Sequence, residues 1–295
     1  MKRDFLELSD LSRDELLGVL DRAAAMKADR RAYRPLEGQS VALIFEKPST
    51  RTRVSFEVGV YELGGHPVVL SSRDMQLGRG ETVEDTARTL SGYVRGVVIR
   101  TFGQEKIVAL AKAARAPVIN ALTDEHHPCQ ILADLQCVKE RKGRVEGLRY
   151  AWVGDGNNVA RSWGQAAQRL GLELALASPE GFQLDPKAEG FGPTVTVTAD
   201  RFEAVRRADV VITDVWASMG QEGEAERRRS AFAGWCVDPR LMAEAAAGAV
   251  VLHCLPAHRG EEIDAVYLDG EGAAVWDEAE NRLHAQKALM ELLLG

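Results

Sequence analysis

The sequence lacks several features that would point to particular classes of protein. No apolar run reaches the roughly 18 residues of a membrane-spanning helix, and the first ten residues, MKRDFLELSD, contain no apolar signal-peptide segment. The four cysteines show no CxxC spacing, so neither a zinc cluster nor a disulfide framework is indicated. Acidic residues outnumber basic ones by 44 to 37, and the net charge of −7 argues against an extended nucleic-acid surface. We therefore expect a cytoplasmic protein whose anionic ligands are small and locally bound.

An α/β pattern is present instead, and it runs through the chain twice. With 295 residues the chain exceeds the length of about 100 to 200 residues that is typical of one domain. The expected strands are 41–45, 66–71, 96–101 and 117–122, followed by those within LRYAWVGDG, LELALAS, DVVITDVW and AVVLHCLP. Because helical patterns separate these strands, the sequence predicts two doubly wound parallel-sheet α/β domains linked by interdomain helices.

The helical run HPCQILADLQCVKERKG ends the first series of strands. Pro128 suits the first turn of this helix, and Gly143 suits its end. We therefore predict domains at 1–143 and 144–277. The last helix, at about 278–295, is expected to pack back on the first domain.

Polar and chemically reactive residues gather where the predicted strands end. Open parallel sheets bind ligands outside the carboxyl ends of their strands. The sequences at these six places are EKPSTRT, RTFG, DEHHPCQ, GDGNN, DVWASMG and HCLPAHRG. A ligand site is expected at this edge of each sheet.

The segment EKPSTRTRVSFEVGV is typical of an anion site at a helix N-terminus. Pro48 and Ser49 stand at the expected helix start, where free N–H groups, the helix dipole, hydroxyls and a guanidinium favour an anion. An ordinary Ser/Thr cap with solvated arginines is the alternative. At about 100° per residue, Arg51 and Arg53 project about 200° apart, so we expect Arg51 to bind the anion and Arg53 to form a structural ion pair. The expected buried stripe of this helix is Val54, Val58 and Tyr61.

Four further residues are candidates because of their positions at strand or helix ends. Arg100 ends a strand, and His127 and Gln130 flank a helix start so that both can face one cleft. A neutral histidine there could donate a hydrogen bond to a carbonyl oxygen. Asp214 ends another strand, where its carboxylate could pair with an ammonium group. The alternatives are a surface arginine, a helix-capping histidine and a turn-forming aspartate.

Two other interpretations are disfavoured by the residues themselves. In GDGNNVA, Val159 replaces the third glycine of a dinucleotide fingerprint and no acidic residue ends the next strand, so NAD binding is not expected. The asparagines can instead present amides to a small zwitterion. A Cys/His hydrolase would need a base beside Cys254, whereas strand alternation predicts that His253 points to the opposite face. A buried, inert cysteine is the usual case.

Five motifs together resemble those of the aspartate/ornithine carbamoyltransferase family. STRTR, HPCQ, DVWASMG, HCLPAHRGEE and NRLHAQKALM occur in that family's order and spacing over nearly the whole chain. The resemblance implies a homotrimer of two-domain subunits that transfers the carbamoyl group of carbamoyl phosphate to the δ-amine of L-ornithine. The products would be citrulline and phosphate, and no metal or organic cofactor would be needed.

The resemblance also implies roles for individual residues. The carbamoyl phosphate ligands would be Ser49, Thr50, Arg51, Thr52, Gln76, Arg100, His127, Gln130 and Arg282, with Gln76 offered to the neighbouring subunit's site. The ornithine ligands would be Asn158, Asp214, Ser218, Met219, Cys254 and Leu255. The catalytic residues among these would be Arg51, Arg100, His127, Asp214 and Cys254. One departure is Cys129, which stands where the family has an aliphatic residue and is expected to point into the helix packing.

Related activities remain as alternatives. An aspartate-specific relative would carry a lysine in the loop that holds Gln76 and HPLPR in place of HCLPA, and this sequence has neither. Asp214 also suits a substrate ammonium better than a substrate carboxylate. Putrescine or acylated ornithine as substrate, and a catalytically silent anion-binding protein of the same fold, stay open. So does the direction of the reaction, which is either arginine biosynthesis or arginine breakdown.

Overall fold

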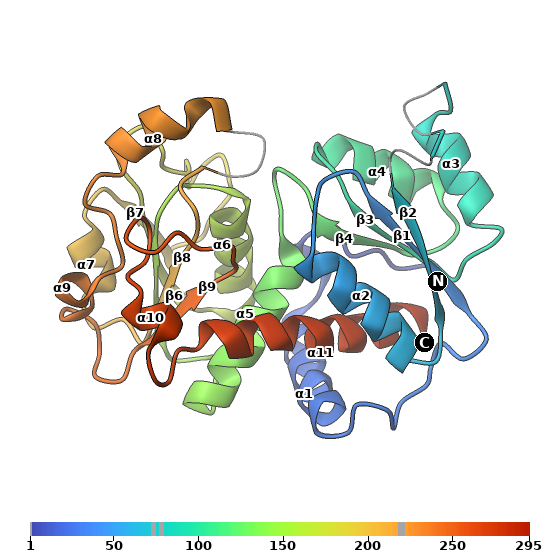
Figure 1. The fold of residues 1–295 in the computed structure, drawn as a ribbon, viewed down its shortest axis with the longest axis horizontal. Helices are drawn as coiled ribbons and strands as arrows, with labels where there is room; N and C mark the ends of the chain where they lie inside the picture. Colours follow the sequence, from blue (N-terminus) through green and yellow to red (C-terminus); the bar gives the residue numbers. More distant parts are fainter. Residues whose placement is uncertain (1, 72–74, 77–79, 218–221) are drawn as a thin grey trace. The chain divides into compact units, whose positions relative to one another are not determined.

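The computed structural model describes residues 2–71, 75–76, 80–217 and 222–295, which form two compact units. The first unit combines Met1–Gln136 with Glu280–Gly295, and the second is Cys137–Ala279 (Figure 1). Each contains a parallel sheet with helices, as the sequence predicts. No helix among the described residues is long and apolar enough to cross a membrane. The domain ends at 143 and 277 stay a prediction.

The sheet of the first unit has four parallel strands in the order β2-β1-β3-β4. The strands are β1 (Ser40–Phe45), β2 (His66–Ser71), β3 (Gly96–Arg100) and β4 (Val118–Leu122). They confirm the four strands expected in this half of the sequence. Every residue of β3 is buried, as is typical of a strand with packed layers on both sides of its sheet.

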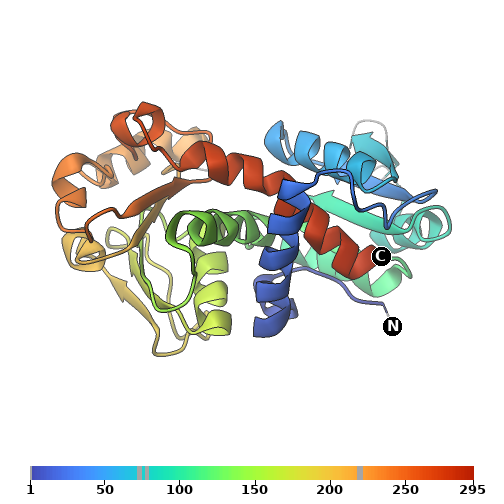
Figure 2. The same cartoon turned by 90° about the horizontal axis from the view of Figure 1, so that it is seen from below.

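Helices α1 and α11 cross each other in the first unit (Figures 1 and 2). The pair Arg22 and Glu291 links them, and the Lys27 ammonium donates to Asn281 at 2.8 Å. The α-helices of this unit are α1 (Arg13–Ala28), α2 (Arg51–Glu62), α3 (Val83–Leu90) and α4 (Gln104–Ala113), with a short 3-10 helix at Leu8–Asp10. Helices α5 (Pro128–Lys142) and α11 (Val275–Leu294) each continue from one unit into the other.

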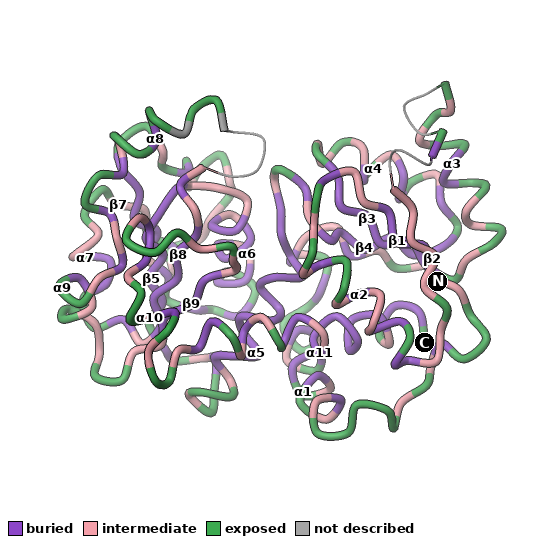
Figure 3. Tube along the Cα trace, in the orientation of Figure 1, coloured by how far each residue is buried: buried purple, intermediate pink, exposed green. Residues whose placement is uncertain are grey.

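The buried face of α2 differs from the predicted stripe. Val54 and Tyr61 are 52% and 68% exposed, so the prediction that they are buried is wrong. Figure 3 shows both exposed and buried segments along α2. The buried residues of α2 are Thr52, Phe56, Gly59, Val60 and Glu62. At Gly59 an added Cβ would lie 3.1 Å from the Met290 methyl carbon and 3.4 Å from the Lys287 side chain, so α11 packs closely on this side. Phe56 and Val60 stand four residues apart on the same face, so the true buried stripe is a second apolar stripe, offset from the predicted one.

The sheet of the second unit has five parallel strands in the order β7-β6-β5-β8-β9. They are β5 (Arg149–Val153), β6 (Glu173–Ala177), β7 (Val195–Thr198), β8 (Val210–Thr213) and β9 (Val250–His253). Edge strand β7 was not predicted, because its VTVT sequence mixes two valines with two threonines and is mostly only half-buried or exposed. The α-helices of the second unit are α6 (Asn158–Leu170), α7 (Arg201–Val205), α8 (Ala225–Ala231), α9 (Pro239–Met242) and α10 (Val266–Asp269), with a 3-10 helix at Glu222–Glu224.

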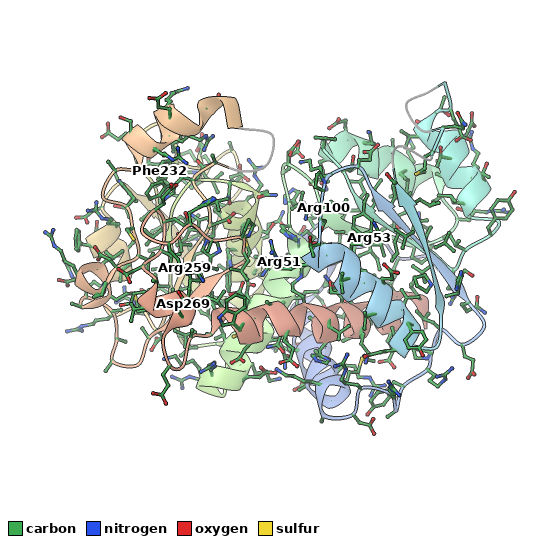
Figure 4. All side chains as sticks on the ribbon, in the orientation of Figure 1. Arg51, Arg53, Arg100, Phe232, Arg259 and Asp269 are labelled. Atoms are coloured by element: carbon green, nitrogen blue, oxygen red, sulfur yellow. The ribbon has the colours of Figure 1, made fainter. Side chains whose placement is uncertain are left out.

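An aromatic cluster supports the loop that follows β8. The rings of Trp216 and Phe232 stack with centroids 5.6 Å apart, and Trp235 meets Phe232 edge-on at 6.3 Å. Phe232, labelled in Figure 4, is fully buried. Pairs of this kind contribute about 0.5 to 1.5 kcal/mol beyond their buried area, so the start of this loop is firmly anchored.

Candidate active site

Helix α2 begins at Arg51, and the residues before it form the proposed anion loop. Ser49 is half-buried, while Thr50 is exposed at the N-cap position. The Thr50 side chain makes no capping hydrogen bond, so the alternative of an ordinary Ser/Thr cap does not describe this helix end. The N–H groups of its first turn are therefore not capped by Thr50, which leaves them suited to an anion.

Two guanidinium groups meet at the hydroxyl of Thr52, which is itself buried. Arg100, the last residue of β3, donates from Nη1 to Thr52 Oγ1 at 3.3 Å. Arg282, on α11, donates from Nη2 to the same oxygen at 3.4 Å and from Nη1 to Gln130 Oε1 at 2.6 Å. Gln130 in turn donates to Asp134 at 2.8 Å. The structure thus brings together four residues that the sequence predicts for this site, from α2, β3, α5 and α11.

His127 lies among the same arginines. It is 5% exposed and directly precedes α5. Burial lowers the pKa of His127 well below its usual 6.5, and the positive charges of Arg282, Arg100 and Arg51 lower it further. The imidazole is therefore held neutral by burial and by the field of three guanidinium groups. Such a concentration of positive charge favours binding of an anion.

Two ion pairs brace the loop between β1 and α2. The Glu46 carboxylate accepts from the Thr101 hydroxyl and from Lys106, at 2.9 Å in the second case. Lys47, which is 6% exposed, pairs with Asp124 in the loop that leads to His127. These two charges are not among the residues predicted for the site, although EK directly precedes the hydroxyl cluster.

The remaining predicted residues of the first unit are more peripheral. Gln76 is exposed. Arg53 is 54% exposed and forms an ion pair with Glu57, with Nε and Oε2 3.7 Å apart.

Cys129 is fully buried, its Sγ donates to the Asn120 carbonyl at 3.2 Å, and burial raises the pKa of its thiol to about 12. Its expected place in the helix packing is thereby confirmed. Figure 4 labels Arg51, Arg53 and Arg100 around the start of α2.

In the second unit, a buried carboxylate follows β8. Asp214 is 5% exposed, and its Oδ1 accepts from the Val215 N–H at 2.8 Å and from Cys254 Sγ at 3.1 Å. Its Oδ2 accepts from Asn157 Nδ2 at 2.8 Å. The prediction named Asn158, which is half-buried at the start of α6, and missed Asn157. Ser218 and Met219 lie outside the described residues.

Asn157 has two functions in this arrangement. Its Oδ1 accepts from the N–H groups of Val159 and Ala160, which caps α6, while its Nδ2 holds Asp214. An asparagine directly before a predicted helix was the available signal. The contact with Asp214 spans 57 positions in the sequence, so no local pattern indicates it.

The predicted orientation of His253 is wrong. One of its ring nitrogens, Cys254 Sγ and an Asp214 oxygen all lie within 4.8 Å of one another. Strand β9 ends at His253, and Leu255 has a positive φ of 59°, so side-chain alternation does not extend to Cys254.

His253 is nevertheless not a base for the thiol. Its Nδ1 accepts from the Leu255 N–H at 2.9 Å, which places the proton on Nε2, 3.0 Å from Glu262. Both nitrogens are therefore engaged. The Nδ1 lone pair accepts from the Leu255 N–H, so it is not available to bind a metal ion together with Asp214 and Cys254. Leu255 itself is half-buried.

The fold and its two side-chain clusters define a class of protein: a two-domain parallel α/β protein with a cluster of guanidinium groups in one unit and a buried carboxylate in the other. Comparison with known families agrees. Residues 3–140 match the aspartate/ornithine carbamoyltransferase carbamoyl-P binding domain, and residues 146–293 match the Asp/Orn binding domain of the same family. The chain belongs to the aspartate/ornithine carbamoyltransferase family.

Individual relatives are similar over their full length. The ornithine carbamoyltransferase of Acidothermus cellulolyticus is 56% identical, with 100% of this chain and 97% of the relative covered. The structure of ornithine carbamoyltransferase from Burkholderia thailandensis is 48% identical with a TM-score of 0.91, and covers 99% of this chain and 98% of the other. The structure from Pyrococcus furiosus is 46% identical with a TM-score of 0.93, and covers 99% and 97%.

Proposed function

We propose that this protein transfers the carbamoyl group of carbamoyl phosphate to the δ-amine of L-ornithine, forming L-citrulline and phosphate. The observation that carries the proposal is the pair of guanidinium groups, Arg100 and Arg282, that meet at the buried Thr52 hydroxyl, in the part of the chain that matches a carbamoyl-P binding domain. The names of the relatives support ornithine as the acceptor. The first unit then binds carbamoyl phosphate and the second binds ornithine.

In the first unit, the anion loop receives the phosphate. Ser49, Thr50, Arg51 and Thr52 supply hydroxyls, a guanidinium and the N–H groups of the first turn of α2. Arg100 adds a second positive charge beside Thr52. Charge-assisted hydrogen bonds of this type are about twice as strong as neutral ones, which suits a doubly charged phosphate.

The carbamoyl group lies toward His127, Gln130 and Arg282 in this proposal. When an amine attacks the carbamoyl carbon, negative charge develops on the carbonyl oxygen. The neutral imidazole and the guanidinium of Arg100 can donate hydrogen bonds to that oxygen in a buried setting, where donors fixed in place stabilise a transition state most effectively. As the carbon–oxygen bond to phosphate breaks, Arg51 stabilises the leaving dianion.

In the second unit, the carboxylate of Asp214 pairs with an ammonium group of ornithine. Asn157 holds this carboxylate in place from one side and the Cys254 thiol from the other. Asn158, Cys254 and Leu255 complete the described part of the ornithine site, to which Ser218 and Met219 are also assigned. Ornithine carries an α-ammonium in addition to the δ-amine that attacks. A carboxylate suits such an ammonium better than the second carboxylate of aspartate, so this site favours ornithine over aspartate.

The reaction balances without an external base. The δ-amine attacks as the free base, one N–H proton is lost, and the released phosphate can carry that proton away as hydrogen phosphate. An alkyl ammonium has a pKa of about 10.4, so at pH 7.4 only about one molecule in a thousand is the free amine. The active site therefore contributes mainly by positioning the two reactants and by stabilising the negative charge on the carbonyl oxygen and the leaving phosphate.

Product identification tests the proposed function. Purified protein is incubated with carbamoyl phosphate and, separately, L-ornithine, putrescine, N-acetylornithine or L-aspartate, and each mixture is analysed by mass spectrometry. We expect citrulline to form with a kcat/KM at least about 100-fold above that for any other amine, because a missing polar partner in a built site costs this much or more. Folded protein that binds carbamoyl phosphate but carbamoylates none of these amines would instead be an anion-binding protein of the same fold.

We further propose a cytoplasmic homotrimer in which Gln76 reaches the active site of the neighbouring subunit. The exposed position of Gln76 is compatible with such a role. Mixing Gln76→Ala with Arg51→Met subunits, each inactive alone, would then create some mixed trimers with one intact site. Recovery of activity on mixing is expected. Subunit exchange without recovery would contradict the sharing of sites.

A further inference from the structure

We infer that Gln286 is a positioning residue that fixes the guanidinium of Arg282 at the carbamoyl phosphate site, an inference that rests on the proposed function. Gln286 is fully buried on α11, one helical turn after Arg282. In the amide orientation that gives both amide atoms partners, its oxygen accepts from Arg282 Nη2 at 2.8 Å and from Arg282 Nε at 3.1 Å. One side of the planar guanidinium is thus held by a single amide.

The other side of the guanidinium faces Gln130 and Thr52, two residues that are predicted to bind carbamoyl phosphate. Its Nη1 donates to Gln130 at 2.6 Å, and its Nη2 also lies 3.4 Å from the Thr52 hydroxyl. An arginine presents its five N–H groups in a rigid fork, so fixing Nε and Nη2 also fixes the direction of Nη1. Gln286 thereby determines where the positive charge and the Nη1 group of Arg282 point.

Gln286 is in turn fixed by α2. Its amide nitrogen donates to Ser55 Oγ at 2.7 Å and to the Arg282 carbonyl at 3.2 Å. The Ser55 hydroxyl thus accepts from the Gln286 amide nitrogen and donates to the Thr52 carbonyl at 3.2 Å. A continuous set of hydrogen bonds therefore connects the first turn of α2, which carries the anion loop, to Arg282.

The neutral amide suits this position better than a carboxylate would. A glutamate could accept the same two hydrogen bonds, but its negative charge would offset the positive charge of Arg282 in a buried environment. With glutamine, Arg282 is oriented while its charge stays available to an anion. Residues that position a guanidinium without neutralising it are what an anion site requires.

Steady-state kinetics of Gln286→Met, Arg282→Met and the double variant test this role. Methionine has a similar size but cannot accept from the guanidinium. Hydrogen bonds to charged groups are strong enough that we expect Gln286→Met to raise KM for carbamoyl phosphate roughly 10- to 100-fold. KM for ornithine should change less than about twofold. In the double variant, the loss should be no larger than in Arg282→Met alone, because residues that act through one another are not additive.

Lys287→Met is the matched control. Lys287 is fully buried on the same helix and donates to Glu62 at 2.9 Å and to the Arg30 carbonyl at 2.6 Å, at the far end of α2 from the anion loop. This variant should lower the melting temperature without the selective rise in KM for carbamoyl phosphate. When it is combined with Arg282→Met, the changes that the two substitutions make in KM for carbamoyl phosphate should add. Equal rises in both KM values for Gln286→Met, or full additivity with Arg282→Met, would overturn the inference.

Binding measurements keep this test separate from the proposed function. If the wild-type protein forms no citrulline, the proposed function fails, and calorimetric titration with carbamoyl phosphate alone then tests Gln286. Weaker binding by Gln286→Met, with no further weakening in the double variant, would support the positioning role. Unchanged affinity in folded Gln286→Met would overturn it.

Discussion

Replacing Arg51 or Arg53 by methionine removes a similar side chain and the same charge from positions two residues apart. Arg51 begins α2 and contributes to the positive charge around His127, whereas Arg53 is 54% exposed and pairs with Glu57. The two side chains leave the helix about 200° apart. We therefore expect very different losses of affinity for carbamoyl phosphate.

The expected magnitudes follow from these environments. A hydrogen bond to a charged group contributes about 1.5 to 3 kcal/mol, so Arg51→Met should weaken binding about 10- to 150-fold. A helix is about 10 to 12 Å across, so Arg53 lies on the order of 10 Å from an anion on the opposite side. At that distance in water, one positive charge contributes about 0.8 kcal/mol with a doubly charged phosphate, or about a fourfold change, and salt reduces it further. The exposed pair with Glu57 adds about 0 to 1 kcal/mol of stability at most.

The measurement is calorimetric titration of both variants with carbamoyl phosphate at about 0.05 and 0.5 M salt, with circular dichroism to establish folding. We expect a large loss for Arg51→Met at both salt concentrations. For Arg53→Met we expect a small loss that disappears at high salt, where the Debye length is much shorter. Similar losses in two folded variants would refute the division that helical geometry makes between these arginines.

Three further predictions concern pH and the second unit. The kcat/KM for ornithine should climb between pH 6 and 9, because the free δ-amine becomes more abundant while the lowered pKa of His127 keeps that residue neutral throughout, and a flat profile would count against this mechanism. Asp214→Asn should reduce kcat/KM for ornithine by about 30-fold or more and leave carbamoyl phosphate binding unchanged, which kinetics and calorimetry together would check. Burial lowers the pKa of His284 to about 4, and the charges of Lys287 and Lys27 contribute to this shift. As pH drops, the histidine therefore becomes protonated in the unfolded chain before it does so in the folded protein. The free energy of unfolding should fall between about pH 6.5 and about pH 4. His284→Leu should flatten that fall in urea unfolding curves, and an unchanged slope would rule out His284 as its source.

Continuous apolar runs made most of the fold predictable. VALIF and GVVIR are strands because both faces of a parallel sheet are covered, and such strands need no alternation. VTVT at the edge was missed because its burial is partial and half of its residues are threonines. The buried face of α2 was predicted wrongly because the helix carries two apolar stripes, one with Val54 and Tyr61 and one with Phe56 and Val60, and only the packing of α11 at Gly59 shows which stripe is buried.

The candidate site was predictable where strand ends and helix starts supply residues directly. Arg100 and His127 were found because their position along the chain already determines the sheet edge at which they lie. Asn157 and Gln286 were missed, since the contacts they make with Asp214 and Arg282 appear only in three dimensions. His253 shows the limit of local geometry: alternation holds only as far as the strand extends, and β9 ends at this residue.

The central claim is that the nitrogen at the δ position of ornithine attacks the carbamoyl carbon, and isotope labelling tests it most directly. Carbamoyl phosphate labelled with ¹³C is incubated with the protein and with ornithine labelled with ¹⁵N only at the δ position. We predict a product whose ¹³C NMR signal shows one-bond coupling to ¹⁵N. A product without this coupling, or phosphate release without any carbamoylated ornithine, would contradict the account.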